Sequence, residues 1–185
     1  QEMTRAIRQS SESLLTIIND ILDFSKIEAG KLPIEKLDFN LIDQIDAVCD
    51  LTALHAEEAG LAFRLELDDK IQEKVIGDPT RLRQILLNLT SNAVKFTSNG
   101  AVTLRVQGKK DASENFVVRV EVEDTGIGMT KDQVQKLFLA FHQADSSTAR
   151  RFGGTGLGLA ISERLISLLG GNIGATSKEG KGSTF

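Results

Sequence analysis

The sequence predicts an α+β fold, a two-layer sandwich in which one mixed β-sheet carries helices on one face, preceded by a long N-terminal helix. Residues 1–29 have the pattern of one long helix, with Ser10 in a gap of its apolar seam. Shorter helical patterns and alternating, strand-like segments follow in blocks, the clearest strands at 61–67, 101–108 and 116–123. Because helices and antiparallel-type strands segregate along the chain, a sheet covered on one face is the expected arrangement.

The composition is that of a globular protein with one core and a small appendage. The 185 residues are 41% hydrophobic, which is enough to build one core. With a formal net charge of −4, a basic footprint for nucleic acid is not expected, and no nucleic-acid partner is predicted. No apolar run reaches the ~18 residues of a membrane span. Cys49 is the single cysteine, and with two histidines the chain has too few ligands for a cysteine or histidine metal cluster.

The N-terminal segment has the pattern of one long amphipathic helix that ends at Gly30. Its apolar residues form a heptad-like seam of Met3, Ile7, Leu14, Ile17, Ile21 and Phe24, widened by Leu15, Ile18, Leu22 and Ile27. Such a helix needs a partner, so we expect an element of a helical bundle or dimer. The alternative is an ordinary amphipathic helix that lies on its own domain.

The remaining elements follow in the order expected for the sandwich. A short strand at 34–39 precedes a helix at 41–58, which Gly60 ends. Asp78-Pro79 opens a second helix, with proline near its first turn. The other predicted elements are strands at 61–67, 74–77, 101–108, 116–123 and 172–177, short helices at 131–138 and 155–169, and a final strand that reaches Phe185.

Three segments are candidates for chemistry, and the first lies on the helix after Pro79. Asn88 and Asn92 are four residues apart and Lys95 follows three later, so two carboxamides and one cation project from one helical face. An amide oxygen with phosphates and waters makes a reasonable magnesium shell, and the lysine adds a point charge for phosphate oxygens. The alternative is a solvated polar face on an otherwise apolar helix.

The second segment, at 123–128, lies where a predicted strand ends. Asp124 can accept a hydrogen bond from an exocyclic amine such as that of adenine. Gly126 and Gly128 allow the backbone to come close to a flat ring. A base pocket is therefore one interpretation, and an ordinary Asp-Gly turn is the alternative.

The third segment, at 153–158, runs from glycines into a helix. Glycine-rich backbone in front of a helix N-terminus is typical of an anion site. The segment is not a Walker motif, because no Gly-Lys-Ser/Thr follows, and not a good dinucleotide fingerprint, because no strand leads into it. The polar stretch at 139–153 is arranged like a lid over a triphosphate. The alternative is a glycine-rich linker.

Together these segments resemble the catalytic part of sensor histidine kinases of the hybrid type. The family's N box is matched by DPTRLRQILLNLTSNAVKFT, its first glycine box by VEDTGIGM, its F box by KLFLAFHQAD, its second glycine box by RRFGGTGLGLAI and its closing glycine motif by GKGSTF. The second helix of the family's dimerisation and phosphotransfer region is matched by INDILDFSKIEAGKL. The resemblance covers essentially the whole chain. It implies the Bergerat-type ATP-binding sandwich that gyrase B, MutL and the heat-shock chaperone ATPases share.

The resemblance implies a role for each candidate residue. It makes Asn92 the magnesium ligand and places Asn88 and Lys95 on the phosphates of ATP, with Asp124 on the adenine amine. The base pocket would be lined by Gly126, Ile127 and Gly128. The phosphates would be bounded by Gly154, Thr155, Gly156, Leu157 and Gly158, with Thr184 as a further nucleotide contact.

The resemblance also assigns the lid. Phe138 and Phe141 would anchor its near end, and Arg150 and Arg151 would reach the γ-phosphate. Many relatives have an arginine where this chain has Gln143. The phosphate-clamping role is therefore open between the two lid arginines.

Two departures bear on the mechanism. The related hydrolytic ATPases carry a glutamate as general base four residues before the magnesium asparagine, where this chain has Asn88. An asparagine cannot accept a proton at neutral pH, so transfer to a protein side chain is favoured over rapid hydrolysis. The family's acceptor histidine is followed by an acidic residue and Thr-Pro, which neither His55 nor His142 matches. The acceptor is therefore expected outside this fragment.

The expected function is that of the ATP-binding catalytic domain of a two-component sensor histidine kinase, with ATP and magnesium as cofactors. Residues 1–30 would be the second helix of the dimerisation and phosphotransfer region, and 31–185 the catalytic domain, truncated in its last strand. The resemblance implies three partners: an acceptor-histidine helix of the same or a partner chain, a response-regulator or receiver domain, and a second copy bound through the N-terminal helix. It also implies the cytoplasmic portion of a membrane-anchored sensor. The alternatives are a regulatory module that docks on other kinases without transferring phosphate, and a hydrolytic ATPase.

Overall fold

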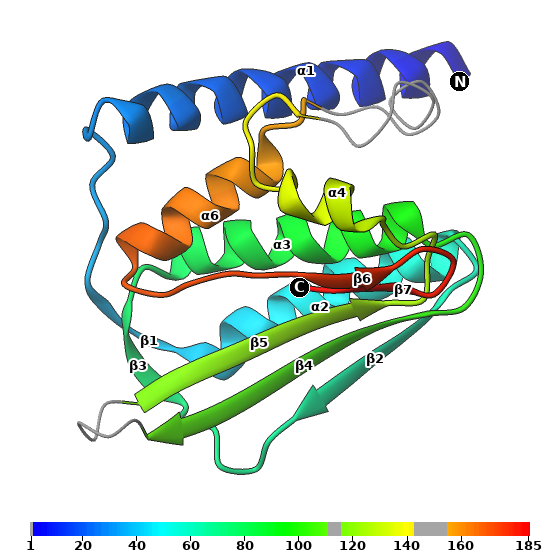
Figure 1. The fold of residues 1–185 in the computed structure, drawn as a ribbon. Helices are drawn as coiled ribbons and strands as arrows, with labels where there is room; N and C mark the ends of the chain where they lie inside the picture. The colour runs from blue at the N-terminus through cyan, green and yellow to red at the C-terminus, as the bar shows by residue number, and fades with distance from the viewer. Residues whose placement is uncertain (1, 111–115, 143–154) are drawn as a thin grey trace.

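A five-stranded β-sheet forms one layer of the molecule, and helices cover one of its faces (Figure 1). The computed structural model describes residues 2–110, 116–142 and 155–185. In spatial order, the sheet contains β2 (Ala62–Leu67), β4 (Ala101–Lys110), β5 (Phe116–Asp124), β7 (Gly182–Thr184) and β6 (Thr176–Lys178). β2 runs parallel to β4 and the other neighbours are antiparallel, which confirms the predicted mixed sheet.

The layer that covers the sheet consists of α2 (Leu41–Glu58), α3 (Pro79–Phe96), α6 (Gly158–Leu168) and the short α4 (Lys131–Gln135). The start of α3 shows why these helices form where they do. The Asp78 carboxylate accepts a hydrogen bond from the backbone N–H of Arg81 at 3.0 Å, and Pro79 occupies the first helical turn. The predicted start of this helix is thus confirmed by its cap.

The hydrophobic core lies between the two layers. Every second residue of β4 points toward the helices, so Val102, Leu104 and Val106 are fully buried. Burial of an aliphatic side chain of this size contributes about 1.5–3 kcal/mol. The helical side of the same core is formed by Ile45 of α2, by Ile85, Leu89 and Ala93 of α3, and by Ile161 and Leu165 of α6.

The opposite face of the sheet carries charges. Arg105 of β4 lies among acidic side chains of both neighbouring strands, with N–O distances of 2.6 Å to Glu66, 3.0 Å to Glu121 and 3.5 Å to Glu123. Glu121 also pairs with Arg119 at 2.6 Å. In the part of the chain that the structure describes, this ladder of charges lies on the face without helices, as expected for a sheet covered on one side.

The first helix, α1 (Glu2–Glu28), crosses the helix layer on the side away from the sheet (Figure 1). Near its end, Phe24 and Ile27 pack against the core, and Asp23 pairs with Arg81 of α3 at 2.9 Å. Gly30, with a φ of 63°, ends the helix. Other large apolar side chains of α1 are 38–60% exposed, namely Leu14, Leu15, Ile17, Ile18, Ile21 and Leu22.

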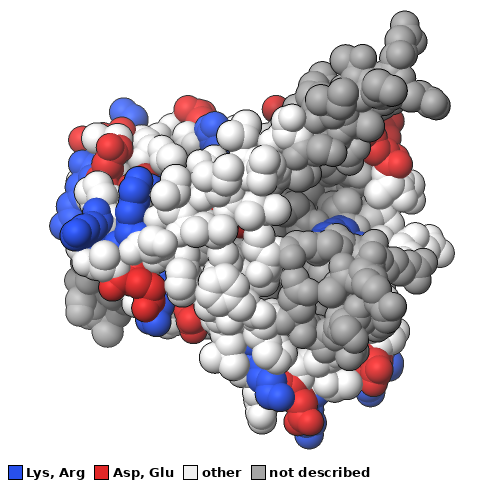
Figure 2. Space-filling view, turned by 90° about the horizontal axis from the view of Figure 1, so that it is seen from above, with Lys and Arg blue, Asp and Glu red and all other residues white. Residues whose placement is uncertain are grey.

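The contacts of α1 with its own domain agree with the second interpretation, and the bundle or dimer element stays a prediction. One face of α1 lies on its own domain, whereas the apolar seam beside it is open. From the α1 side, the middle of the molecule shows a broad surface with few charged residues (Figure 2). Within the described ranges, no helix combines the length and the apolar character that a bilayer span requires.

The structure differs from the predicted elements at several bounds. The strand expected at 34–39 is β1 (Leu37–Asn40), and it pairs with β3 (Lys74–Gly77) in a separate two-stranded sheet. The helix expected at 155–169 starts only at Gly158, because Gly156 has a φ of 70°, which no helix accommodates. The helix expected at 131–138 ends at Gln135, and the strand expected at 172–177 begins only at Thr176, after glycines that weaken strand pairing.

Candidate functional site

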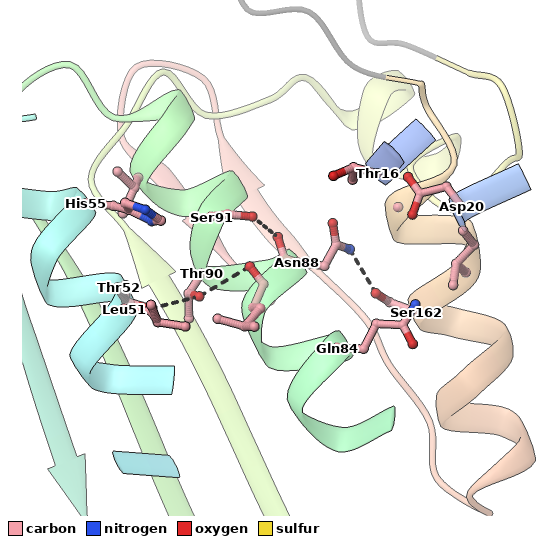
Figure 3. Close-up of a pocket in the computed structure, with 14 residues that line it drawn as sticks. Thr16, Asp20, Leu51, Thr52, His55, Gln84, Asn88, Thr90, Ser91 and Ser162 are labelled. Atoms are coloured by element: carbon pink, nitrogen blue, oxygen red, sulfur yellow. Dashed lines mark hydrogen bonds between the residues drawn. The ribbon is translucent and has the colours of Figure 1, made fainter. Parts of the chain in front are cut away.

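The side chain of Asn88, on α3, points toward Ser162 in the first turns of α6 (Figure 3). The Nδ2 atom of Asn88 donates a hydrogen bond to Oγ of Ser162 at 2.8 Å. The Nδ2 atom of Asn92 donates to Oδ1 of Asn88 at 3.4 Å, which is long for such a bond. Helical spacing places the two carboxamides side by side, as the sequence predicts, and the contact with Ser162 orients them.

Lys95 lies further along α3 and is half-buried. Its Nζ atom is 5.1 Å from the centroid of the Phe96 ring, a distance typical of a cation–π contact. Burial lowers the pKa of Lys95, because the ammonium group loses solvation. An anion beside this ammonium would compensate for that loss.

The Asp124 carboxylate is buried at the end of β5, with 5% of the residue exposed. Its Oδ1 atom accepts a hydrogen bond from the backbone N–H of Gly126 at 2.8 Å. Burial raises the pKa of Asp124, and hydrogen bonds from Gly126 and Ser183 act against that rise. A buried acceptor that its own turn holds in place is suited to accept a hydrogen bond from an amine of a ligand, when that ligand excludes water from the site.

The turn after Asp124 is joined to the C-terminal end of α3. The backbone N–H of Ile127 donates to the carbonyl of Phe96 at 3.2 Å. A Cβ atom at Gly126 would overlap that same carbonyl, so this approach requires glycine. The Ile127 side chain is 48% exposed, which leaves an apolar group at the surface of the turn.

The hairpin of β6 and β7 holds the same turn from another side. The backbone N–H of Gly180 donates to the carbonyl of Ile127 at 2.7 Å. Gly128 has a φ of 63°, and a Cβ atom there would overlap the carbonyl of Lys178. Thr184 pairs with the end of β5. The candidate base pocket is therefore built by contacts between three separate parts of the chain.

The second glycine segment enters α6 next to Asn88. Gly156 has a φ of 70°, and the helix begins at Gly158. A Cβ atom at Gly158 would lie 2.5 Å from Oδ1 of Asn88. The backbone N–H of Leu157 donates to Oγ1 of Thr155 at 3.1 Å, which fixes the approach to the helix. The first turn of α6 therefore lies directly against the asparagine face of α3.

The predicted lid is only partly within the described residues. Phe138 is half-buried. Phe141 has a φ of 61°, which is uncommon for a residue with a side chain, and is 67% exposed. Its ring meets that of Phe24 of α1 edge-on, with 5.9 Å between the centroids, and its backbone N–H donates to the carbonyl of Gly156 at 3.1 Å. The candidates that lie outside the described residues are Gln143, Arg150, Arg151 and Gly154.

A cavity of about 390 Å³ adjoins the asparagine face (Figure 3). Its walls come from α1, α2, α3 and α6, and they include Asn88, Gly158 and Ser162. Asp124 and Gly126 are not among its lining residues. The cavity is therefore a hollow between α1 and the helix layer, and it is distinct from the candidate base pocket.

α1 places a carboxylate at this cavity. Oγ1 of Thr155 donates to Oδ2 of Asp20 at 3.4 Å. Burial raises the pKa of Asp20 and the hydrogen bond from Thr155 lowers it, while the nearby charge of Asp23 raises it. The N-terminal helix thus contacts the residues that lead into α6.

The structure brings the described candidate residues together along α3. Phe96 contacts the Asp124 turn, and Asn88 contacts the first turns of α6. Eight residues separate Phe96 from Asn88, which at the rise of an α-helix is about 12 Å along the helix axis. Asn92 and Lys95 lie between these two ends. This arrangement matches an elongated ligand with a flat ring at one end and anionic groups at the other.

Ser162, Asp20 and Phe96 are not among the residues that the sequence pattern singles out. Ser162 follows Gly158 by four residues, so helical spacing could have placed both on one face of α6. For Asp20 no such signal exists, because its contact with Thr155 joins residues 135 positions apart.

Comparisons with known proteins agree with this geometry. Residues 77–185 match the family described as histidine kinase-, DNA gyrase B-, and HSP90-like ATPase. The signal transduction histidine-protein kinase BarA of Escherichia coli (strain K12) is 45% identical over 179 residues, which are 97% of this chain and 20% of BarA. The crystal structure of full-length ShkA in complex with AMPPNP has a TM-score of 0.83 and 34% identity, over 97% of this chain and 36% of ShkA. The histidine kinase ThkA in complex with the response regulator protein TrrA has a TM-score of 0.69 and 26% identity, over 97% of this chain and 47% of ThkA.

The glycine turns and the polar helix that they meet lie within the residues that match an ATPase family. The chain belongs to the family of histidine kinase-, DNA gyrase B- and HSP90-like ATPases. Within that family, its similarity over nearly the whole chain is to histidine kinases, so its catalytic domain is of the histidine-kinase kind. The chain spans about a fifth of the length of the curated relatives it matches.

Proposed function

We propose that this chain binds ATP with magnesium and transfers the γ-phosphoryl group to a histidine side chain. Adenine is assigned to the Asp124 turn. The triphosphate is assigned to the space between the start of α6 and the α3 face that carries Asn88, Asn92 and Lys95. Arg150 and Arg151 are the proposed clamp on the γ-phosphate.

One observation carries the choice of transfer over hydrolysis. Asn88 stands four residues before the proposed metal ligand Asn92, and its carboxamide is bonded to Ser162 at 2.8 Å. A carboxamide cannot accept a proton at neutral pH, so water has no general base at this position. In-line transfer to a side chain depends mainly on positioning and charge neutralisation, which the site offers.

The residues of the site would act by binding and orientation. Asp124 would accept a hydrogen bond from the exocyclic amine of adenine, at a position from which water is largely excluded. Lys95 attracts the phosphate oxygens, and its half-buried position strengthens that attraction relative to bulk water. The N-terminus of α6, which begins at Gly158, adds backbone N–H groups for the phosphates.

The donor set at Asn92 fits magnesium. An amide oxygen is a hard ligand of the kind that this cation takes. The Nδ2 atom of Asn92 is engaged with Asn88, which directs the amide oxygen elsewhere. When bound, magnesium would neutralise phosphate charge and help to orient the γ-phosphoryl group.

The same proposal covers the organisation of the chain. Residues 1–30 would be the second helix of a dimerisation and phosphotransfer region, and 31–185 the catalytic domain. The exposed apolar seam of α1 supports a partner helix in a homodimer. The acceptor histidine would lie on a helix of the same or a partner chain. A response-regulator or receiver domain would bind next, as TrrA binds ThkA. We further propose that the site works on the cytoplasmic side of a membrane-anchored sensor.

ATP labelled at the γ-phosphate tests this function. The chain is incubated with it, with and without magnesium, together with a separately made helical pair that carries the family's acceptor motif. We expect acid-labile label on the acceptor histidine in the presence of magnesium, and none on the chain alone. Asn92→Ala should abolish transfer, whereas Asn99→Ala, at an exposed position just after α3, should not change it.

Each alternative predicts a different outcome. Steady release of free phosphate without label on the acceptor would identify a hydrolytic ATPase. Absence of ATP affinity in calorimetry would identify a regulatory module. Stable acid-labile label on the chain alone would contradict the assignment of the acceptor to another segment.

A further inference from the structure

Ser162 lies between α6 and α3 and holds the side chain of Asn88. The serine is 2% exposed, and its Oγ atom accepts the hydrogen bond from Nδ2 of Asn88 at 2.8 Å. The backbone of Gly158, one turn earlier, closes on the other end of the same carboxamide, since a Cβ atom there would lie 2.5 Å from Oδ1. α6 therefore binds the Asn88 carboxamide at one end and closely approaches it at the other.

The orientation of the Asn88 carboxamide decides which atom of Asn92 faces it. Because Nδ2 of Asn88 points to Ser162, its Oδ1 atom faces Asn92 and accepts from Nδ2 of Asn92 at 3.4 Å. The amide oxygen of Asn92 is thereby directed away from Asn88. In the reverse orientation, Nδ2 of Asn88 would bind Oδ1 of Asn92, the atom that a hard cation requires.

We propose that Ser162 is a positioning residue, which sets the orientation of Asn88 and through it presents the amide oxygen of Asn92 to magnesium. This inference rests on the proposed function, because it concerns the metal of that same site. It assigns Ser162 no contact with the nucleotide. Groups that orient a metal ligand typically change metal affinity by about 10- to 100-fold when they are removed.

A merely structural serine would behave differently, and the chain offers a matched control for that case. Thr90 of α3 is 1% exposed, and its Oγ1 atom shares a hydrogen bond with Oγ1 of Thr52 of α2 at 3.0 Å, on the side away from α6. Thr90→Val removes this buried hydroxyl while the side chain keeps its shape. Thr52 retains its bond to the carbonyl of Val48 at 2.7 Å. Both variants thus lose one buried helix–helix hydrogen bond, but only one of them faces the asparagines.

The experiment compares the wild type with Ser162→Ala, Ser162→Thr and Thr90→Val. Calorimetry gives the ratio of the ATP affinity in magnesium to the ATP affinity in EDTA. We expect this ratio to fall about tenfold or more in Ser162→Ala, with adenosine affinity unchanged. Ser162→Thr keeps the hydroxyl and should recover most of the ratio. Thr90→Val should have the wild-type ratio even if it melts at a lower temperature.

A second measurement needs no ligand. In NMR spectra of the free protein, the side-chain amide protons of Asn88 should exchange slowly in the wild type and in Thr90→Val, and rapidly in Ser162→Ala. Three results would each overturn the inference. They are an unchanged ratio of ATP affinities in Ser162→Ala, an equal fall of that ratio in Thr90→Val, and rapid exchange of the Asn88 amide protons in the wild type. The wild type could show slow exchange of the Asn88 amide and yet bind no ATP. That result would refute the proposed function and the role of Ser162 in metal binding, and only the orientation of Asn88 by Ser162 would stand.

Discussion

At the scale of single residues, Asp124 is subject to opposite demands from stability and from recognition. Burial raises its pKa, so the folded protein holds the carboxyl proton more tightly than the unfolded chain does. The protonated carboxyl therefore adds to the free energy of unfolding. This contribution is complete below the pKa of the unfolded chain, about 3.9, and is lost as the pH rises through the higher pKa of the folded protein. At neutral pH, the ionised carboxylate is therefore less favourable for the fold than the protonated form would be, although it keeps its hydrogen bonds from Gly126 and Ser183.

We predict that Asp124→Asn binds ATP about tenfold or more weakly and yet is at least as stable as the wild type at pH 7. The amide does not replace a charged acceptor for the adenine amine, a contact worth about 1.5–3 kcal/mol. As the pH rises above about 4, the wild type should lose stability relative to the variant. Calorimetry with ATP and thermal melts across pH check both points. A variant that loses stability relative to the wild type over that range would show that the burial of Asp124 does not penalise its charge.

Gly158 is the position where one added methyl group should affect the nucleotide. Within a helix, replacing glycine by alanine normally stabilises by about 0.5–1 kcal/mol. Here the new Cβ atom would lie 2.5 Å from Oδ1 of Asn88, so the carboxamide has to move. We predict that Gly158→Ala binds ATP about tenfold or more weakly in magnesium. Gly174→Ala, with no atom within 4 Å of its Cβ, is the control and should bind like the wild type. Equal affinity of the two variants would refute the prediction.

At this scale, the sequence predicts which residues are candidates but not how they are turned. The common face of Asn88, Asn92 and Lys95 follows from the helical period alone. Ser162 contacts Asn88 across 74 positions, and a serine in a helix has no pattern that reveals such a contact. The atom that each carboxamide presents is decided by tertiary hydrogen bonds, which local sequence does not contain.

At the scale of elements, prediction succeeds where local pattern and capping agree. α2 and α3 have the expected starts because Asn40 and Asp78 cap them with side-chain hydrogen bonds. β1 and β6 differ from expectation because each is short and depends on pairing with another strand. For α1, the heptad-like seam shows an apolar face but not what covers it, so two alternatives stay open until the tertiary contacts are known.

The attachment of α1 to the domain should depend on Asp23. Its Oδ2 atom accepts hydrogen bonds from Arg81 and Gln84, each at 2.9 Å, and its side chain is 17% exposed. Because hydrogen bonds to a mostly buried charge are lost, Asp23→Ala should lower the free energy of unfolding by about 2 kcal/mol and loosen the end of α1. Hydrogen exchange of the amides at 14–28 measures this loosening.

The ion pair between Glu28 and Arg164 is the control for that experiment. The two side chains are 3.5 Å apart and both more than half exposed. Glu28→Gln should therefore change stability by less than about 0.5 kcal/mol. Wild-type exchange rates in Asp23→Ala would show that the apolar contacts of Phe24 and Ile27 hold the helix without the ion pair.

At the scale of the whole molecule, the candidate site joins the two layers. The end assigned to the base is built on β5 of the sheet, and the end assigned to the phosphates on α3 and α6. The hydrogen bond from Ile127 to Phe96 connects the two. The sequence predicts these layers, because strands and helices come in blocks, but it does not predict that the C-terminal end of α3 is the junction. A ligand that occupies both ends would link sheet and helices, and at 100 times its Kd it would raise the free energy of unfolding by about 2.7 kcal/mol.

Because the two ends lie apart on one helix, the two halves of ATP should bind independently. We predict that adenosine and inorganic tripolyphosphate bind at the same time, and that ATP displaces both. ATP should bind about 100-fold or more tightly than either half, because its second half binds without a further loss of translational freedom. Competition calorimetry measures this, with Asp124→Asn expected to weaken adenosine alone and Lys95→Ala to weaken tripolyphosphate alone. If adenosine displaced tripolyphosphate, the two ends would overlap, and the assignment of the base to the Asp124 turn and of the phosphates to the Asn88 face would be wrong.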